Sequence, residues 1–323
     1  MFPLSLLVRN RISQIVYKLT VVATINVFVL SILSLFGNHL FIELTTHFRL
    51  QYILIGVLCV PLLLGFRSWK LLPVVVLVVV FNSLYLTPYY SSPRVGTLTN
   101  AQSGIRLIQV NLLYTNTNSD RAMTAIQAAN ADVVVLQELT DDWRQRLQAF
   151  NQLYPYSEWQ PRQRGSGMAV LSRFPLKETR VLELDAGTSR PAILTRVTVG
   201  SNSMTLLSLH PPTPVTRQRF THRNRQFREA AAILANVSEP KVLIGDLNTS
   251  MWSPYFSQLL QEAGLRDARL GFGLQTTWPA PLPGLFRLAI DHCLVSDQVQ
   301  VGNVRVGAAT GSDHYPLIID LKL

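Results

Sequence analysis

The sequence predicts an α/β (α+β) domain preceded by three transmembrane helices. Three apolar runs lie within the first 90 residues, and short apolar strands alternating with helical stretches begin at Ile105. Only 15% of the 323 residues are charged, whereas average soluble proteins have about 25%. This composition excludes disordered, collagen-like and coiled-coil chains. We therefore expect a membrane domain at 1–90, a Ser/Pro/Gly-rich linker at 91–104 and a second domain at 105–323.

The three apolar runs cover residues 19–36, 50–66 and 71–86. A helix needs about 20 residues to cross the hydrocarbon core, within a range of about 17–25. The first run reaches this length, and interfacial tyrosines extend the other two. These tyrosines are Tyr52, Tyr85, Tyr89 and Tyr90. Two alternatives stay open: a signal peptide followed by a buried core, although no small-residue cleavage site follows Phe36, and a strand pair at 71–86, because valine runs favour strands.

Positive charge predicts how these helices are oriented. Residues 1–100 contain seven basic residues and one acid, a net charge of +6, and residues 101–323 contribute +4. The basic residues gather in the N-terminal tail and in the turn 67–70, whereas Arg49 in the intervening loop is offset by Glu43. Tail and turn belong on the cytoplasmic side. Three crossings of the plasma (inner) membrane then place the N-terminus in the cytoplasm and the domain at 105–323 outside.

The second domain has the pattern of a sheet-and-helix fold, with apolar strands separated by amphipathic stretches and turns. Strands are expected at 105–110, 133–136, 167–171, 192–199, 204–209, 242–244, 289–295 and 317–321. Helices are expected at 120–130 and 223–234.

Polar residues capable of chemistry stand where these apolar strands end. They are Asn111, Glu138, His210, Asp246, Asn248, Asp291, Asp313 and His314. A lone Asn or Asp after a strand is more often a turn former, and a lone His is more often a hydrogen-bonded structural residue. Four carboxylates, two amides and two histidines at strand ends together favour a site, because strand ends can converge on one edge of a sheet.

Hydrolysis at phosphorus is the chemistry that this residue set allows. Mg²⁺ prefers oxygen ligands from a few carboxylates, with water and phosphate completing its shell. The sequence has no cysteine cluster or His-x-x-x-His helix for zinc, no Gly-x-Ser-x-Gly elbow and no P-loop. These absences disfavour zinc enzymes, serine hydrolases and NTP-driven functions.

Six short motifs in order carry a family resemblance over about residues 104–323. They are Gln109-Val110-Asn111, Gln137-Glu138, Ser208-Leu209-His210, Gly245-Asp246-Leu247-Asn248, Ile290-Asp291-His292 and Ser312-Asp313-His314. Together they resemble the endonuclease/exonuclease/phosphatase superfamily, which includes DNase I-like nucleases, apurinic-site endonucleases, neutral sphingomyelinases and inositol polyphosphate 5-phosphatases. The membrane segment makes the whole chain similar to bacterial membrane-anchored members.

The resemblance implies a four-layer αββα sandwich of two mixed sheets, with the site along one edge. It implies that Glu138 is the main Mg²⁺ ligand, with Asn111 beside it and Asp313 near the metal, and Mn²⁺ as a possible substitute. Asp246 would orient or deprotonate the attacking water, and Asn248 would hold the phosphate or Asp246. The remaining roles are those of His314, which would stabilise the scissile phosphate, Asp291, which would orient His314, and His210, a second phosphate contact.

Several features lie beside these motifs. Leu113 stands where apurinic-site endonucleases have Asp, which weakens the case for a DNA-repair enzyme, and His292 is interpreted as a neighbour of the site. The segment 217–228 holds five arginines and is either an anion-binding edge or a solvated helix face. Arg190 and Trp278 are candidate substrate contacts, although a surface charge and a core tryptophan are their simpler interpretations.

Three functions are therefore compared. The first is a membrane-tethered Mg²⁺-dependent phosphodiesterase or phosphatase, and the second is an extracytoplasmic nuclease acting on DNA or RNA. The third is a catalytically silent protein that binds a lipid headgroup or a partner. The expected partner is a phosphate-ester substrate, either a lipid headgroup or a nucleic acid, and no protein partner is predicted.

Overall fold

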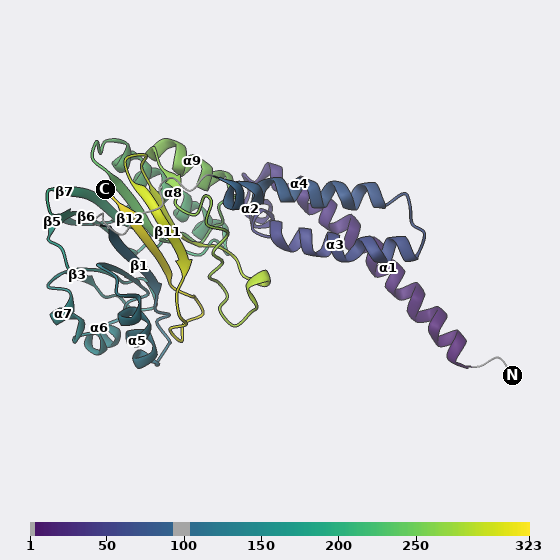
Figure 1. Cartoon of the computed structure of the whole chain (residues 1–323), viewed down its shortest axis with the longest axis horizontal. Coiled ribbons are helices and arrows are strands. Elements are labelled where there is room, and N and C mark those ends of the chain that lie inside the picture. Colours follow the sequence, from purple (N-terminus) through teal and green to yellow (C-terminus); the bar gives the residue numbers. More distant parts are fainter. Residues whose placement is uncertain (1–3, 93–103) are drawn as a thin grey trace. The chain divides into compact units, whose positions relative to one another are not determined.

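The computed structural model describes residues 4–92 and 104–323, which form two compact units, Met1–Pro88 and Tyr89–Leu323 (Figure 1). Nearly all of the predicted linker at 91–104 lies outside the described residues.

The first unit is helical. Its helices are α1 (Leu4–Leu33), the short 3₁₀ turn η1 (Ser34–Phe36), α2 (Leu40–Thr46), α3 (Arg49–Gly65) and α4 (Leu72–Ser91), whose last turn enters the second unit. Within the described residues, two helices are long and apolar enough to cross a membrane, Arg11–Phe36 and Leu72–Ser91. A third span would require α2 and α3 to act together, although they are bent by 64°.

The alternative of a strand pair at 71–86 is wrong, because this valine-rich run is helical throughout α4. The preference of valine for strands is weak and depends on neighbouring strands. A helix satisfies its backbone hydrogen bonds within one apolar segment, which a lone strand pair cannot do.

A buried polar cluster joins three helices of the first unit. Arg49 at the start of α3 donates to Asn82 of α4 at 3.1 Å, and Asn82 donates to Ser31 of α1 at 2.9 Å. The Arg49 guanidinium also lies 3.7 Å from the centroid of the Tyr85 ring. Arg49 and Glu43 are both buried, so the interpretation of this pair as loop charges is wrong. Such polar contacts hold apolar helices in register.

Two six-stranded sheets form the centre of the second unit. The first sheet has the order β11 (Gln300–Val306), β12 (Leu317–Lys322), β1 (Ile105–Asn111), β2 (Val133–Gln137), β4 (Met168–Ser172) and β3 (Tyr156–Gln160). The second has the order β5 (Leu176–Leu182), β6 (Ala192–Val199), β7 (Asn202–Ser208), β8 (Lys241–Asp246), β10 (Asp291–Val295) and β9 (Arg266–Asp267). The pairs β1–β2 and β7–β8 are parallel and the other pairs are antiparallel, which confirms two mixed sheets.

The sheets pack face to face, and helices cover their outer faces. Leu107 and Val135 of the first sheet meet Leu206 and Ile244 of the second in one buried core. The outer face of the first sheet packs against α5 (Ser119–Ala129), α6 (Asp141–Arg146) and α7 (Phe150–Leu153). The helices α8 (Arg217–Ala235) and α9 (Pro254–Ala263) lie with the second sheet, where the Phe256 ring centroid is 4.6 Å from that of His292 (Figure 1).

Elements with exposed or irregular patterns escaped the sequence analysis. The predicted helix at 223–234 begins earlier, at Arg217, because the Thr216 hydroxyl accepts from the Arg219 backbone N–H at 3.2 Å and caps it. The missed elements are α2, β3, β5, β9, β11, α6, α7, α9 and the 3₁₀ turn η2 (Gly284–Phe286). The strands β3 and β5 lie at sheet edges and contain no fully buried residue, so they lack a continuous apolar run.

Candidate active site

Polar side chains gather between the two sheets, at the ends of the strands β1, β2, β8 and β10. Because successive residues point to opposite faces, Leu107 in the inter-sheet core places Gln109 and Asn111 on the same face. In the first sheet Asn111 lies opposite Gln137, and in the second Asp246 lies opposite Asp291. Each sheet therefore contributes one facing pair of polar side chains.

Two buried glutamines join these pairs across the sandwich. Gln109 Nε2 lies 2.7 Å from Gln137 Oε1 and 2.7 Å from Asp291 Oδ1. Gln137 Oε1 also accepts from the Asp246 backbone N–H at 3.0 Å, and Gln137 Nε2 donates to the Leu209 carbonyl at 3.0 Å. Gln109 and Gln137 were not proposed as site residues, although the strand period that selects Asn111 also selects them.

A second chain of contacts runs from Asp246 to Glu138. Asn111 Nδ2 donates to Asp246 Oδ2 at 3.1 Å and lies 3.3 Å from Glu138 Oε1. The other Glu138 oxygen accepts from the Tyr114 backbone N–H at 3.1 Å, and Asn111 Oδ1 accepts from the Leu113 N–H at 3.0 Å. Asn111 therefore presents its N–H groups to both carboxylates.

His314 lies between two buried carboxylates. Its Nδ1 is 2.9 Å from Asp291 Oδ2, and its Nε2 is 3.6 Å from Asp246 Oδ2. Burial opposes a charge on this imidazole, but Asp291 and Asp246 outweigh it and raise the pKa of His314 above its ordinary value. Thr277 adds a hydroxyl that donates to Asp291 Oδ2 at 2.5 Å. The two carboxylates therefore favour the cationic form of His314, whose Nε2 faces Asp246.

The two aspartates of this cluster have opposite acidities. Burial raises the pKa of Asp246, against the attraction of His314, and the neighbouring Asp291 and Glu138 add to the rise. Burial would also raise the pKa of Asp291, but His314, Thr277 and Gln109 lower it below its ordinary value. Asp246 is therefore the carboxyl group with the higher pKa of the pair, and Asp291 is the one with the lower pKa.

His210 approaches Asp246 from another direction. Its Nε2 lies 3.6 Å from Asp246 Oδ2, and its Nδ1 lies 3.1 Å from Arg190 Nη1. Burial lowers the pKa of His210 well below its ordinary value, and the positive Arg190 and His314 lower it further. His210 is therefore neutral, and Arg190 donates to it.

Two residues of the site have backbone conformations that residues other than glycine rarely adopt. Glu138 and Asn248 have positive φ values of 58° and 51°, in a region that is uncommon for residues other than glycine. Asn248 is held there because its N–H donates to Asp246 Oδ1 at 2.9 Å and its Nδ2 donates to the Pro211 carbonyl at 3.1 Å. Only glycine fits at position 245, because a Cβ there would collide with the Leu209 carbonyl and the Gln137 amide.

Three further residues named in the sequence analysis, Trp278, Asp313 and His292, lie beside this cluster. Trp278 is half-buried, its ring centroid is 6.3 Å from that of His314, and its Nε1 donates to Asp313 Oδ2 at 3.0 Å. Across residues 104–323, no hydrogen bond or ion pair joins Asp313 to Glu138 or Asn111. His292 bonds Arg269 at 2.8 Å and the Thr249 carbonyl at 2.8 Å, on the opposite face of β10 from Asp291.

The donor chemistry of the cluster fits a hard divalent cation. Asp246, Asp291 and His314 offer ligand atoms within 4.8 Å of one another, and Asn111 links this group to Glu138. Throughout the described part of the second unit, no lysine or arginine forms an ion pair with Glu138, which is half-exposed. An oxygen-rich group with an uncompensated carboxylate is what Mg²⁺ prefers. Both imidazole nitrogens of His314 already face carboxylates, so the Glu138 side of the cluster is where a metal ion could be held.

The family model of the endonuclease/exonuclease/phosphatase family matches residues 100–314. This match and the two-sheet fold place the site among hydrolases that act on phosphate esters and generally depend on divalent metal ions. The chain belongs to the endonuclease/exonuclease/phosphatase family. No match to a curated protein was found.

Solved structures share the fold at low sequence identity. A Beutenbergia cavernae endonuclease/exonuclease/phosphatase is 20% identical with a TM-score of 0.54, covering 69% of this chain and 72% of its own. Sphingomyelinase C from Streptomyces griseocarneus is also 20% identical with a TM-score of 0.51, covering 68% and 99%. D. rerio TDP2, in a complex with a single-strand DNA product, is 17% identical with a TM-score of 0.58, covering 69% and 100%.

Proposed function

We propose that this protein is a membrane-tethered, divalent-metal-dependent hydrolase of phosphoric esters, a phosphodiesterase or phosphatase. The observation that carries the proposal is the arrangement around Asp246, whose Oδ2 faces His314 Nε2 and His210 Nε2 at 3.6 Å each. A buried carboxylate with a raised pKa beside a cationic imidazole supplies a base and a stabilising charge at one point.

Each residue of the cluster has a separate part in this proposal. Asp246 accepts a proton from the attacking water, and the N–H of Asn248 fixes the orientation of its carboxylate. His314 stabilises the negative charge that develops on the phosphoryl oxygens, and Asp291 holds its imidazole in place. His210, which is neutral, offers an N–H to the same phosphate. Trp278 lies beside His314 and forms part of the substrate groove.

Glu138 would hold Mg²⁺, or Mn²⁺ in its place, with Asn111 and Asp313 beside it. When bound, the cation would neutralise charge on the phosphoryl oxygens of the substrate. Two observations support this assignment: Glu138 is only partly buried, and within residues 104–323 no lysine or arginine forms an ion pair with it.

Removing divalent metal is expected to abolish hydrolysis of bis(p-nitrophenyl) phosphate by the full chain in detergent, and adding Mg²⁺ or Mn²⁺ is expected to restore it. Glu138→Gln keeps the shape of the side chain but removes its charge. We expect it to lower kcat by at least about a hundredfold, because metal ions contribute several kcal/mol to such reactions.

Glu262→Gln is the matched control, because Glu262 is exposed on α9 and, among the residues that the structure describes, accepts a hydrogen bond from Gln258 of the same helix alone. Its kcat should equal that of the wild type. Turnover that persists in EDTA, or a Glu138→Gln variant as active as the control, would reject the metal assignment. No turnover with any metal would favour the catalytically silent headgroup- or partner-binding protein.

The proposal includes the location of the enzyme. We infer three membrane crossings in a membrane domain at 1–90, with α2 and α3 together as the second, a linker at 91–104 and a catalytic domain at 105–323 outside the plasma membrane. The helices Arg11–Phe36 and Leu72–Ser91, together with the basic tail and turn, support this orientation.

Trypsin added to intact spheroplasts is expected to digest the domain at 105–323, as followed by an antibody against the C-terminus. A cytoplasmic protein probed in the same sample controls for lysis. Full protection of the C-terminal domain in intact spheroplasts, with digestion after detergent, would reverse the proposed orientation.

A nuclease is the second candidate function. It is favoured by the basic pocket beside Arg190 and by the fold that the chain shares with a TDP2 solved with single-strand DNA. A nuclease binds many phosphates along its substrate, so its affinity should fall steeply with salt.

A further inference from the structure

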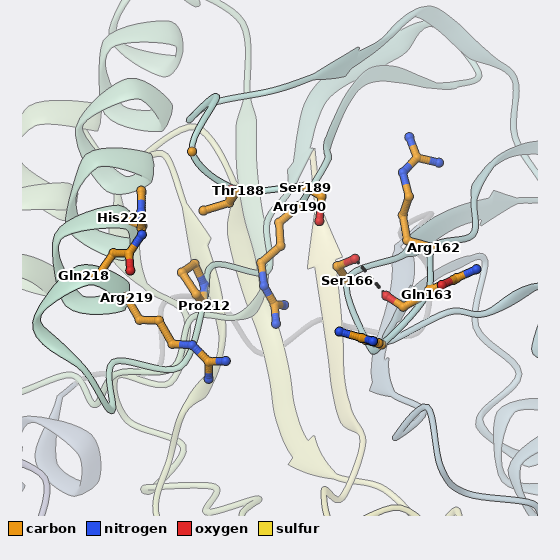
Figure 2. Close-up of a pocket in the computed structure, with 12 residues that line it drawn as sticks. Arg162, Gln163, Ser166, Thr188, Ser189, Arg190, Pro212, Gln218, Arg219 and His222 are labelled. Atoms are coloured by element: carbon orange, nitrogen blue, oxygen red, sulfur yellow. Dashed lines mark hydrogen bonds between the residues drawn. The ribbon is translucent and has the colours of Figure 1, made fainter.

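A large pocket opens next to the proposed active site. Its volume is about 680 Å³, and three segments line it: the β3–β4 loop, the loop before β6, and the start of α8 with Pro212 ahead of it (Figure 2). A space of this size accommodates a compound larger than a single phosphate. We call it the arginine pocket because Arg162, Arg164, Arg190 and Arg219 line it.

The lining of the arginine pocket is positively charged. None of its lining residues is an Asp or Glu, and across residues 104–323 none of the four arginines forms an ion pair. Arg162 donates to the Pro161 carbonyl at 3.0 Å, and Arg190 donates to the Gly165 carbonyl at 3.4 Å, which are neutral acceptors.

Other arginines of α8 behave differently. Arg225 is paired with Asp185 at 3.0 Å, and Asp185 also holds the pocket residue His222. Arg219, by contrast, points its guanidinium to the same side of the pocket as Arg190, whereas Arg162 points away from both (Figure 2). Burial lowers the pKa of Arg190, the nearby Arg219 lowers it further, and Glu138 and Asp246 oppose this. Two guanidinium groups on one side of a pocket whose lining holds no carboxylate define a position for an anion.

The arginine pocket and the active site share a wall. Arg190 Nη1 lies 3.1 Å from His210 Nδ1, and the other edge of that imidazole lies 3.6 Å from Asp246 Oδ2. On the opposite wall, Gly165 stands between two pocket residues and packs so closely on Glu138 that a Cβ would touch its carboxylate. An anion on Arg190 is therefore separated from the attack position by one imidazole ring.

We propose that the arginine pocket binds a second phosphate group of the same substrate molecule, attached to a compact headgroup a short distance from the ester that is cleaved. This inference rests on the proposed function for the position of the first phosphate. The substrate class is then a phosphate ester that carries a further phosphate.

A compact headgroup fits the pocket better than a nucleic-acid strand. Proteins that bind single strands combine a basic groove with aromatic rings on which successive bases stack. No aromatic residue other than His222 lines the arginine pocket, and the Nδ1 of His222 is held by Asp185. The arginines supply phosphate recognition without a stacking surface.

Binding without turnover provides the test. The full chain in detergent and EDTA is titrated by calorimetry with 1,3-propanediol bisphosphate and with propyl phosphate. We expect the bisphosphate to bind at least about tenfold more tightly, because charge-assisted bonds to arginine are strong and the two groups are tethered. The double variant Arg164→Gln/Arg219→Gln should reduce the ratio of bisphosphate affinity to propyl phosphate affinity to near one. It should leave the affinity for propyl phosphate unchanged.

Arg228→Gln is the control, since Arg228 is an exposed arginine of α8 that does not line the pocket. It should retain the full ratio. Equal affinity for the two probes in the wild type overturns the proposal. So does independent binding of two inorganic phosphates with no gain from tethering. Tighter, strongly salt-dependent binding of an eight-nucleotide single strand assigns the pocket to nucleic acid and overturns it as well.

A second pair of probes identifies the source of the phosphate. Dioctanoyl phosphatidylinositol 4-phosphate and dioctanoyl phosphatidylinositol differ by one phosphate and carry the same acyl chains. The ratio of affinities between the two lipids is compared with the ratio between the two soluble probes. A larger ratio for the lipids identifies a lipid headgroup as the ligand. An equal ratio identifies recognition of the phosphate alone. Binding is measured in EDTA, where no metal-dependent turnover occurs, so it does not depend on the enzyme being active. A failure of the proposed function would appear in the turnover assay, and a failure of this inference would appear in the binding assay.

Discussion

Asp246→Asn is expected to lower kcat by about a thousandfold while the domain stays folded. The carboxylate is 2% exposed, and its two oxygens accept from the Asn248 N–H at 2.9 Å and from Asn111 Nδ2 at 3.1 Å. An asparagine has the same shape and can retain one of these bonds. Its amide cannot accept a proton at neutral pH, so general-base catalysis is lost, which typically contributes about 10²- to 10⁴-fold.

The measurement is kcat for bis(p-nitrophenyl) phosphate with saturating Mg²⁺, together with a thermal unfolding curve. Asp297→Asn is the matched control, because the Asp297 side chain is almost fully exposed and lies 3.7 Å from Arg266. A loss of kcat with an unchanged unfolding temperature assigns the effect to chemistry. Wild-type kcat in Asp246→Asn would exclude this residue as the base.

Asp291→Asn is expected to lower kcat by about 10²- to 10⁴-fold through a different cause. Asp291 accepts from Gln109, Thr277 and His314, and its charge stabilises the imidazolium of His314. The amide of asparagine has only one acceptor oxygen, and its NH₂ group facing Nδ1 would select the neutral tautomer of His314. In serine proteases, removing the charge of the corresponding aspartate has an effect near the upper end of this range.

Thr277→Val separates charge from packing. It removes one hydrogen bond to Asp291 but keeps the carboxylate, so we expect at most about a tenfold loss. NMR titration of His314 provides a direct readout, because its pKa should fall in Asp291→Asn and change little in Thr277→Val. Equal losses of kcat in the two variants, with no change in the His314 pKa, would show that Asp291 acts only through packing.

The sequence predicted most of the strand ends that build the site. Asn111, Asp246 and Asp291 each close an apolar inner strand or open one, and this pattern is visible in the chain because strands buried on both faces are continuously apolar. Edge strands such as β3 and β5 have exposed, mixed sequences and gave no such signal.

Contacts across the sandwich could not be predicted in the same way. Gln109 meets Asp291 over a separation of 182 residues, and the pairing depends on how the two sheets stack. The arginines of segment 217–228 illustrate the limit further: Arg223 is buried, Arg225 pairs with Asp185, and Arg219 lines the pocket. Neither the anion-binding edge nor the solvated face describes all of them, because each arginine points to a different neighbour.

The contacts of Gln109 and Gln137 between the two sheets make the active site depend on the correct strand register. A shift of β1 by one residue would turn Gln109 and Asn111 to the outer face, so that Asp246 would lose the Asn111 donor and Asp291 the Gln109 donor. A chain with the wrong register is therefore less stable, because it buries the proposed catalytic carboxylates with fewer hydrogen bonds. For the same reason, a descendant that lost catalysis could not replace these groups with apolar side chains one at a time. It would have to replace the whole set with apolar side chains to keep a stable sandwich.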